Sequence, residues 1–77
     1  MMEKIEITTE YIRLDQFLKL SAAVGSGGDA KFLITNGFVK LNDEVMLMRG
    51  KKLYPGDKVF LSYEDQEFLF EVSVAEE

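Results

Sequence analysis

The sequence predicts an α+β fold, in which two short helices pack on a small antiparallel sheet. Apolar residues recur at helical spacing from about Arg13 until Ala22 to Gly25 and again over 26–36, and elsewhere they alternate with polar residues as in half-buried strands. Turn-forming residues separate these segments, most clearly at Asn42-Asp43 and at Pro55-Gly56-Asp57. Because the chain has 77 residues, we expect a single domain over 1–77.

The N-terminal part predicts a strand followed by a helix. Residues 4–8 alternate, with Ile5 and Ile7 on one side of a half-buried strand. From about Arg13 the apolar residues recur at helical spacing, which predicts an amphipathic helix of about two to three turns. Its expected buried side consists of Leu14, Phe17 and Leu18, and its expected solvent side of Asp15, Gln16 and Lys19.

A second helix is predicted to begin at Ser26 and to end at Asn36-Gly37. The Ser26 hydroxyl can accept a backbone N–H of the first turn, and Asp29 completes a pair that is similar to a capping box. Gly37 can adopt positive φ and close the helix. The expected buried stripe consists of Ala30, Leu33 and Ile34. A tight turn between the two helices gives a hairpin of helices.

The remaining residues predict antiparallel strands. Residues 38–41 and 44–48 flank Asn42-Asp43, which suits a two-residue hairpin turn. Pro55 and Gly56 fit the two central positions of a type II turn. The last predicted strands are 58–63 and 68–74.

The composition excludes several classes of function. The chain contains no cysteine and no histidine, so the commonest zinc ligands and the commonest general acid or base are absent. No carboxylate stands in an apolar setting, and no glycine-rich nucleotide loop is present. We therefore expect no enzyme activity, no cofactor and no bound metal. No apolar run reaches membrane-spanning length and no signal segment opens the chain, so a cytoplasmic location is expected.

Charge is distributed unevenly along the chain. The net charge is −5, yet residues 13–58 hold eight of the nine basic residues and five of the fourteen acidic ones. Residues 59–77 hold six acidic residues and no basic one. Since exposed charges are screened beyond about 8 Å, a polyanion responds to the local patch that it touches. Each basic residue alone is typical of a solvated surface, but together those of 13–58 can converge and neutralise phosphates.

Two features have two interpretations each. Ser26-Gly27-Gly28 either forms a tight turn with a capping serine or presents backbone N–H groups to a phosphate at a helix N-terminus. Phe32 and Phe38 either fill a thin core or offer a surface on which a base stacks beside Lys31 and Lys40.

Four segments, in this order and spacing, resemble the alpha-L RNA-binding domain, which is named after the small-subunit ribosomal protein "S-four". The segments are Arg13-Leu14-Asp15, Ser26 to Lys31, Asn36 to Asn42, and Pro55-Gly56-Asp57. The resemblance covers about 50 of the 77 residues, with a core over about 13–61. The chain looks closest to the small YaaA-like and YbcJ-like members, which are regarded as RNA-binding and ribosome-associated. The resemblance implies an alpha-L motif, with two helices against a curved antiparallel sheet and RNA on the helix pair and adjoining hairpin.

The resemblance also implies which residues bind RNA. Many members have arginine directly after the serine, where this chain has Gly27, so that phosphate contact is either lost or made by backbone N–H groups. The resemblance carries RNA binding over to Arg13, Ser26, Lys31, Lys40 and Asn42. With the other basic residues and the backbone donors, the complete candidate set for RNA binding is Arg13, Lys19, Ser26, Gly27, Gly28, Lys31, Lys40, Asn42, Arg49, Lys51 and Lys52.

We therefore expect a non-enzymatic protein that binds ribosomal or other structured RNA through phosphates and shape, in ribosome assembly or translation. Its expected partners are RNA and the ribosome or ribosomal proteins, with no membrane and no DNA. The alternative is a protein–protein interaction adaptor on the same fold that has weak or lost RNA affinity. Gly27 and the acidic segment 59–77 favour that alternative.

Overall fold

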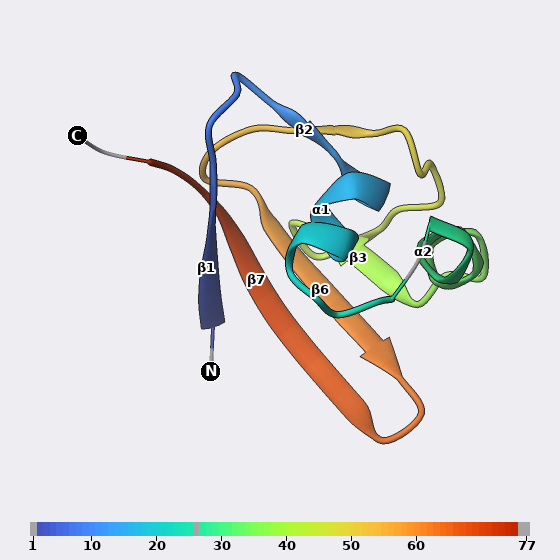
Figure 1. Cartoon of the computed structure of the whole chain (residues 1–77). Coiled ribbons are helices and arrows are strands. Elements are labelled where there is room, and N and C mark those ends of the chain that lie inside the picture. Colours follow the sequence, from blue (N-terminus) through green and yellow to red (C-terminus); the bar gives the residue numbers. More distant parts are fainter. Residues whose placement is uncertain (1, 26, 76–77) are drawn as a thin grey trace.

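The computed structural model describes residues 2–25 and 27–75, and it confirms the α+β class. Within those residues, two helices accompany a five-stranded sheet and a separate two-stranded sheet (Figure 1). The elements are β1 (Met2–Ile7), β2 (Ile12–Arg13), α1 (Leu14–Leu20), α2 (Gly27–Thr35), β3 (Val39–Leu41), β4 (Glu44–Val45), β5 (Lys52–Leu53), β6 (Lys58–Tyr63) and β7 (Gln66–Val74).

Helix α1 buries the apolar side that its sequence predicts, but one polar residue differs from expectation. Leu14, Phe17 and Leu18 are fully buried. The expectation that Asp15 faces solvent is wrong, because this residue is only 9% exposed. Its carboxylate accepts a 3.0 Å hydrogen bond from Arg13 Nη2 and a 2.8 Å hydrogen bond from the backbone N–H of Gln16. These two donors satisfy the buried oxygens within the first turn of the helix.

Helix α2 ends at Thr35 and is closed at Asn36-Gly37, as predicted. The buried stripe of Ala30, Leu33 and Ile34 is confirmed. Gly37 has a φ of 83°, its N–H donates to the Ile34 carbonyl, and the N–H of Phe38 donates to the Leu33 carbonyl. This pair of hydrogen bonds is a Schellman motif, which satisfies carbonyls that the last turn would otherwise leave free. The predicted cap at Ser26 lies outside the described residues.

The five-stranded sheet has the order β1-β7-β6-β3-β4. Its β7-β6-β3-β4 part is antiparallel, as expected. The sheet as a whole is mixed, because β1 pairs with β7 in parallel, from Met2 opposite Leu69 to Ile7 opposite Val74. Strand β4 is shorter than the predicted return strand 44–48 and ends at Val45.

Both predicted tight turns are present. Asn42 and Asp43 have φ values of 50° and 71°, as a two-residue type I′ hairpin requires. Gly56 has a φ of 99°, and the Asp57 N–H donates to the Tyr54 carbonyl at 3.0 Å, as expected for a type II turn.

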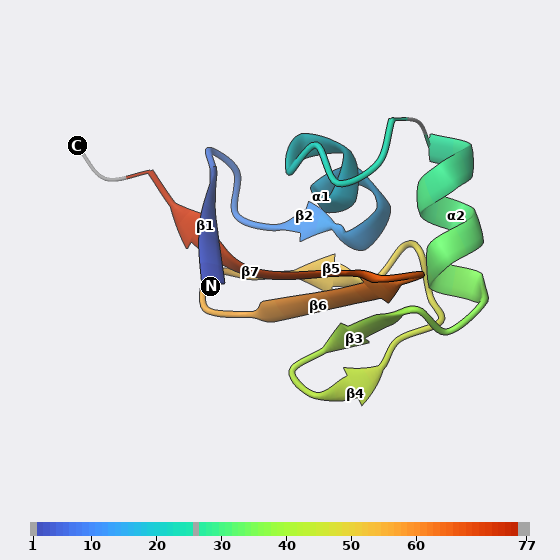
Figure 2. The ribbon, with the colours of Figure 1, turned by 90° about the horizontal axis from the view of Figure 1, so that it is seen from below.

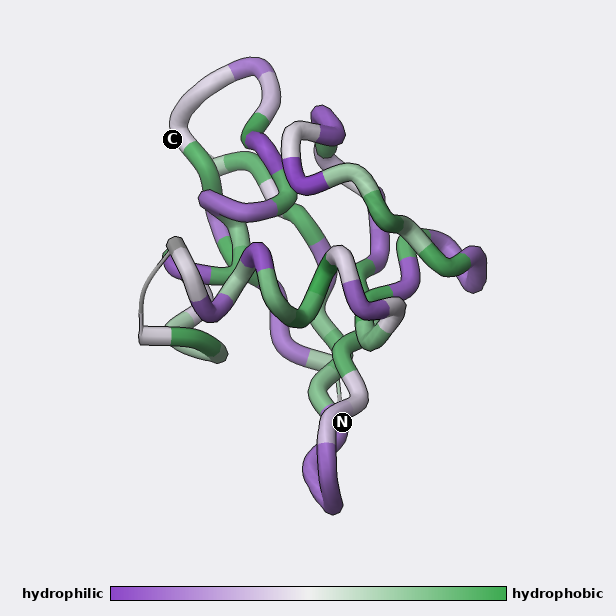
Figure 3. Tube along the Cα trace, turned by 90° about the vertical axis from the view of Figure 1, so that its right-hand side faces the viewer, coloured by the Kyte–Doolittle hydropathy of each residue, from purple (hydrophilic) through white to green (hydrophobic). Residues whose placement is uncertain are grey.

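The core lies between the helices and one face of the five-stranded sheet. Figure 2 shows α1 above the sheet and α2 at one end of the molecule. In Figure 3 the tube is hydrophobic along the middle of β6 and β7, whereas the turn between these two strands is hydrophilic. Buried residues from both layers form one cluster: Ile7, Leu14, Phe17, Leu18, Ala30, Leu33, Ile34, Val39, Leu41, Leu53, Val59, Leu61, Phe70 and Val72. Since side chains alternate along strands, the opposite face of the sheet faces solvent.

Candidate RNA-binding site

A two-stranded pairing that the sequence did not reveal organises the site. Strand β2 pairs antiparallel with β5, so that Ile12 lies opposite Leu53 and Arg13 opposite Lys52. Leu53 is fully buried, and its burial anchors β5 to the hydrophobic core. Ile12 is half-buried, whereas Arg13 and Lys52 are exposed, so alternation along the strands places these two cations on the solvent side of the ribbon.

The basic loop before β5 packs against the first turn of α1. The backbone N–H of Leu14 donates to the Lys51 carbonyl at 2.8 Å, and that of Asp15 donates to the Arg49 carbonyl at 3.1 Å. A Cβ placed on Gly50 would lie 4.0 Å from Arg13 Nε, so the loop and the Arg13 side chain are neighbours. Two segments far apart in sequence therefore meet here with their cations exposed. We call Arg13, Arg49, Lys51 and Lys52 the basic surface.

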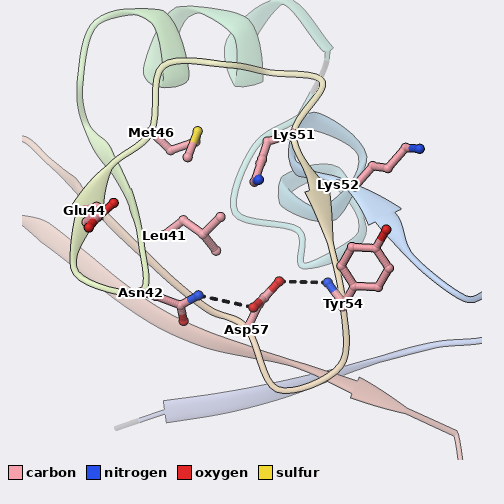
Figure 4. Close-up of a pocket in the computed structure, with 8 residues that line it drawn as sticks. All are labelled: Leu41, Asn42, Glu44, Met46, Lys51, Lys52, Tyr54 and Asp57. Atoms are coloured by element: carbon pink, nitrogen blue, oxygen red, sulfur yellow. Dashed lines mark hydrogen bonds between the residues drawn. The ribbon is translucent and has the colours of Figure 1, made fainter.

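A groove lies between the β3–β4 hairpin and β5 (Figure 4). Its volume is about 440 Å³. Lys51 points into the groove, whereas Lys52 and the ring of Tyr54 lie on the other side of β5. The lining is mixed in charge and includes Leu41, Asn42, Glu44, Met46, Lys51, Lys52, Tyr54 and Asp57.

The side-chain amide of Asn42 forms hydrogen bonds within the protein through both its oxygen and its nitrogen. Its Oδ1 accepts the Lys58 backbone N–H at 2.9 Å, and its Nδ2 donates to Asp57 Oδ1 at 3.2 Å. The second carboxylate oxygen of Asp57 accepts the Tyr54 N–H at 2.8 Å. These bonds tie the β3–β4 turn to the turn that precedes β6, so Asn42 shapes the rim of the groove.

Sequence comparison identifies the family. Residues 5–69 match the S4 domain. The chain belongs to the S4 domain family. It is similar to a Bacillus subtilis (strain 168) protein named "Probable ribosome maturation protein RlbA", with 49% identity over 59 residues. That match covers 77% of this chain and 83% of the relative. The S4 domain is an RNA-binding domain and is generally non-enzymatic, so the expected RNA-binding module is confirmed.

Several candidate residues of this S4 domain lie on the helices rather than on the basic surface. Lys19 is exposed in the last turn of α1, and Lys31 is exposed on α2. Gly27 and Gly28 form the start of α2. Ser26 is not among the described residues. Helix α2 stands at one end of the molecule, so RNA that reaches Lys31 would have to extend beyond β2 and β5 (Figures 1 and 2).

Lys40 lies on the opposite side of the sheet from the helices. Its neighbours Val39 and Leu41 are buried against the core, whereas Lys40 itself is exposed. It stands opposite Phe60 on β6 and Val45 on β4. The S4 domain therefore presents Lys40 on a different face from Arg13 and Lys52.

The two phenylalanines that permitted two interpretations differ in their surroundings. Phe38 is half-buried, and its ring centroid lies 4.9 Å from that of Tyr63. Phe32 is 49% exposed, and its ring centroid lies 5.9 Å from that of Tyr63. Phe32 also lines a hollow together with Asp29, a negatively charged neighbour for any base. Base stacking at Phe32 stays a prediction.

Two exposed tyrosines were missed by sequence reasoning. Tyr11 precedes β2 and Tyr54 follows β5, and their ring centroids lie 6.0 Å apart. The signal was present in the sequence, because each tyrosine stands two positions from a cation of the basic surface.

The described part of the chain, 2–25 and 27–75, contains no helix that is long and apolar enough to cross a membrane. Among the same residues, no group of three or more carboxylates is placed to hold a metal ion.

Proposed function

We propose that this S4 domain protein binds ribosomal RNA through the basic surface and acts in ribosome maturation. The observation that carries the proposal is the packing of the loop 49–51 on α1, which brings Arg49 and Lys51 beside the strand pair of Arg13 and Lys52, with Lys51 turned into the groove and Lys52 on the other side of β5 (Figure 4). A relative with 49% identity is named as a probable ribosome maturation protein, which supports the choice of ribosomal RNA.

The proposed mode of binding is phosphate neutralisation guided by shape. Lysine and arginine side chains supply most of the sequence-independent affinity for nucleic acid, and releasing counterions makes that affinity depend on salt. The guanidinium of Arg13 forms an ion pair with Asp15, with Nη2 3.0 Å from Oδ2, and the Arg13 side chain is still 51% exposed. A phosphate can therefore approach Arg13 from the solvent side while the hydrogen bond to Asp15 remains in place.

The other candidate residues take different parts in the proposal. Lys19, Lys31 and the backbone of Gly27 and Gly28 would extend the contact over the helices. Ser26, which lies outside the described residues, stays a candidate. Asn42 would act by holding the groove rim in shape, since its amide already bonds Lys58 and Asp57. Lys40 would take part only if the RNA also reaches the outer face of the sheet.

The proposal includes no chemical step. The S4 domain is generally non-enzymatic, and the protein would act by binding to a ribosomal particle during its assembly in the cytoplasm.

An adaptor role on the same fold is the second candidate, and one feature of the sheet favours it. A row of paired positions crosses the outer face, and it includes apolar side chains on four of the five strands. The apolar members are Met2, Leu69, Phe60 and Val45. Such a row suits a protein partner better than RNA.

One experiment separates the two candidates. The protein is titrated with purified ribosomal RNA at about 50 mM salt, and in parallel it is sedimented with ribosomal particles. The proposal predicts binding to the naked RNA and enrichment on particles. Enrichment on particles without binding to naked RNA would favour the adaptor.

A further inference from the structure

Four side chains share the solvent face of the β2–β5 ribbon. Arg13 lies opposite Lys52 in the register of the two strands. Tyr11 precedes β2 and Tyr54 follows β5, each two positions from these cations. The two tyrosine rings approach each other, with centroids 6.0 Å apart and ring planes at 46°. Because opposite residues of an antiparallel pair point to the same face, the two rings and the two cations form adjacent rows. We call Tyr11, Arg13, Lys52 and Tyr54 the β2–β5 face.

Both tyrosine rings remain open to solvent. Tyr11 is 38% exposed and Tyr54 is 46% exposed. The ammonium of Lys52 lies over the Tyr11 ring, 4.7 Å from its centroid, and so covers part of that ring. Tyr54 is the more exposed of the two rings and offers the larger free aromatic surface.

The two cations stand where like charges repel. Residues directly opposite in an antiparallel pair have neighbouring side chains, and like charges at such positions destabilise the pair. The carboxylate of Asp15 compensates the charge of Arg13, since Asp15 Oδ2 lies 3.0 Å from Arg13 Nη2. Lys52 turns toward the Tyr11 ring. A bound phosphate would offset the remaining repulsion, because it can accept hydrogen bonds from both side chains.

We infer that the β2–β5 face is a subsite for an unpaired RNA nucleotide, whose base stacks on Tyr54 while its flanking phosphate is bound by Arg13 and Lys52. The inference rests on the proposed function and adds a substrate class to it. Bases inside an RNA duplex are already stacked on their neighbours, so only a base in a loop, bulge or end can stack on a protein ring. Ribosomal RNA with an unpaired nucleotide beside a helix is therefore the preferred ligand.

The charge of the face argues for a nucleotide over a protein segment. Aromatic rings that alternate with cations are the common basis of single-stranded nucleic acid binding, because every base has a stacking face and every nucleotide carries a phosphate. Phe68 on β7 is 36% exposed, against 46% for Tyr54, and it lies outside the basic surface. The structure thus offers a matched aromatic position outside the proposed subsite.

The test compares two RNAs and three substitutions in the full chain. One RNA is a perfect duplex from ribosomal RNA, and the other is the same duplex with a short unpaired loop. Dissociation constants are measured for the unaltered protein, Tyr54→Leu, Tyr54→Phe and Phe68→Leu, after circular dichroism has confirmed that each is folded. We expect the unaltered protein to prefer the looped RNA by about 5-fold to 100-fold, the range that one stacked base provides.

The substitutions decide whether Tyr54 provides that preference. Tyr54→Leu should abolish most of the preference for looped RNA, Tyr54→Phe should keep it, and Phe68→Leu should leave it unchanged. A preference that survives Tyr54→Leu, or that is lost in Phe68→Leu, would overturn the subsite. Equal binding of both RNAs by the unaltered protein would refute the subsite alone, whereas binding of neither RNA would refute the proposed function.

Discussion

The backbone N–H of Leu14 donates a 2.8 Å hydrogen bond to the carbonyl of Lys51, and this contact joins the two segments that carry the basic surface. The first N–H groups of any helix lack partners within the helix. In α1 the carbonyls of the basic loop supply two of the missing acceptors, at Leu14 and Asp15. Formation of the helix therefore also orders the loop, and the cations are positioned before RNA binds.

Removing one cation of the basic surface should lower both the RNA affinity and its dependence on salt. Arg49→Ala and Lys51→Ala should each weaken binding by a similar factor for all RNA sequences, because they remove a phosphate contact rather than a base contact. Each should also reduce the slope of log affinity against log salt by about 1. Fluorescence anisotropy over a salt series measures both quantities.

Lys4→Ala is the matched control for these substitutions. Lys4 is an exposed lysine on β1, outside the basic surface, and its removal changes the net charge by the same amount. A slope that changes equally in Lys4→Ala would mean that the total charge of the protein, and not the basic surface, governs binding.

Substitution of Asp15 should lower stability without lowering RNA affinity. Asp15→Ala removes the acceptor for the Gln16 N–H and the partner of Arg13, so we expect a loss of about 1 kcal/mol in the free energy of unfolding. The freed Arg13 should bind RNA at least as tightly as before. Urea unfolding and RNA titration measure the two effects, and a parallel loss of affinity in the folded protein would contradict the assignment of Arg13 as a phosphate ligand.

Sequence patterns correctly predicted the turns, because the conformation of a turn depends on interactions between residues close in sequence. Gly37, Asn42 and Gly56 were each assigned to a turn by residue type, and each has positive φ in the structure. Pairing partners were harder, because alternation identifies a strand but not its neighbour. The parallel pairing of β1 with β7 joins the two ends of the chain, and each of β2 and β5 has only two residues. No periodicity can be read from two residues, so the basic surface was predicted as a set of residues without its scaffold.

Burial of Asp15 was missed for a different physical reason. The residue type favours solvent, and helical spacing placed it on the polar side of α1. The packing of the loop 49–51 over the first turn covers it, and that packing depends on residues far away in sequence.

The Asn42–Asp57 hydrogen bond should stabilise the fold without contributing directly to RNA affinity. Asn42→Ala leaves the Lys58 N–H without its side-chain acceptor and places alanine at a φ of 50°, so we expect a loss of about 1–2 kcal/mol in unfolding free energy. Asp57→Asn should cost less, since one side-chain oxygen remains for the Tyr54 N–H. Chemical denaturation measures both, and an Asn42→Ala protein of full stability would contradict this structural role.

Glycine substitutions should show whether a loss of stability comes from an unfavourable backbone conformation or from a steric clash of the added Cβ. Gly37→Ala and Gly56→Ala should each lower the free energy of unfolding by about 1 kcal/mol, because φ values of 83° and 99° strain any residue with a Cβ. The cause is not a clash, since a Cβ on Gly37 would lie 3.9 Å from Val45 and one on Gly56 would have no neighbour within 4 Å. Gly50→Ala is the control, because its φ lies outside this range, and it should be close to neutral. Equal effects at all three positions in thermal unfolding would refute this explanation.

The affinity of the unaltered protein for purified ribosomal RNA, measured at about 50 and 200 mM salt, tests the central claim most directly. If the four cations of the basic surface each neutralise one phosphate, binding should be measurable at the lower salt and weaken by about 100-fold at the higher. Absence of binding at about 50 mM salt, or an affinity that does not change between the two conditions, would contradict the account.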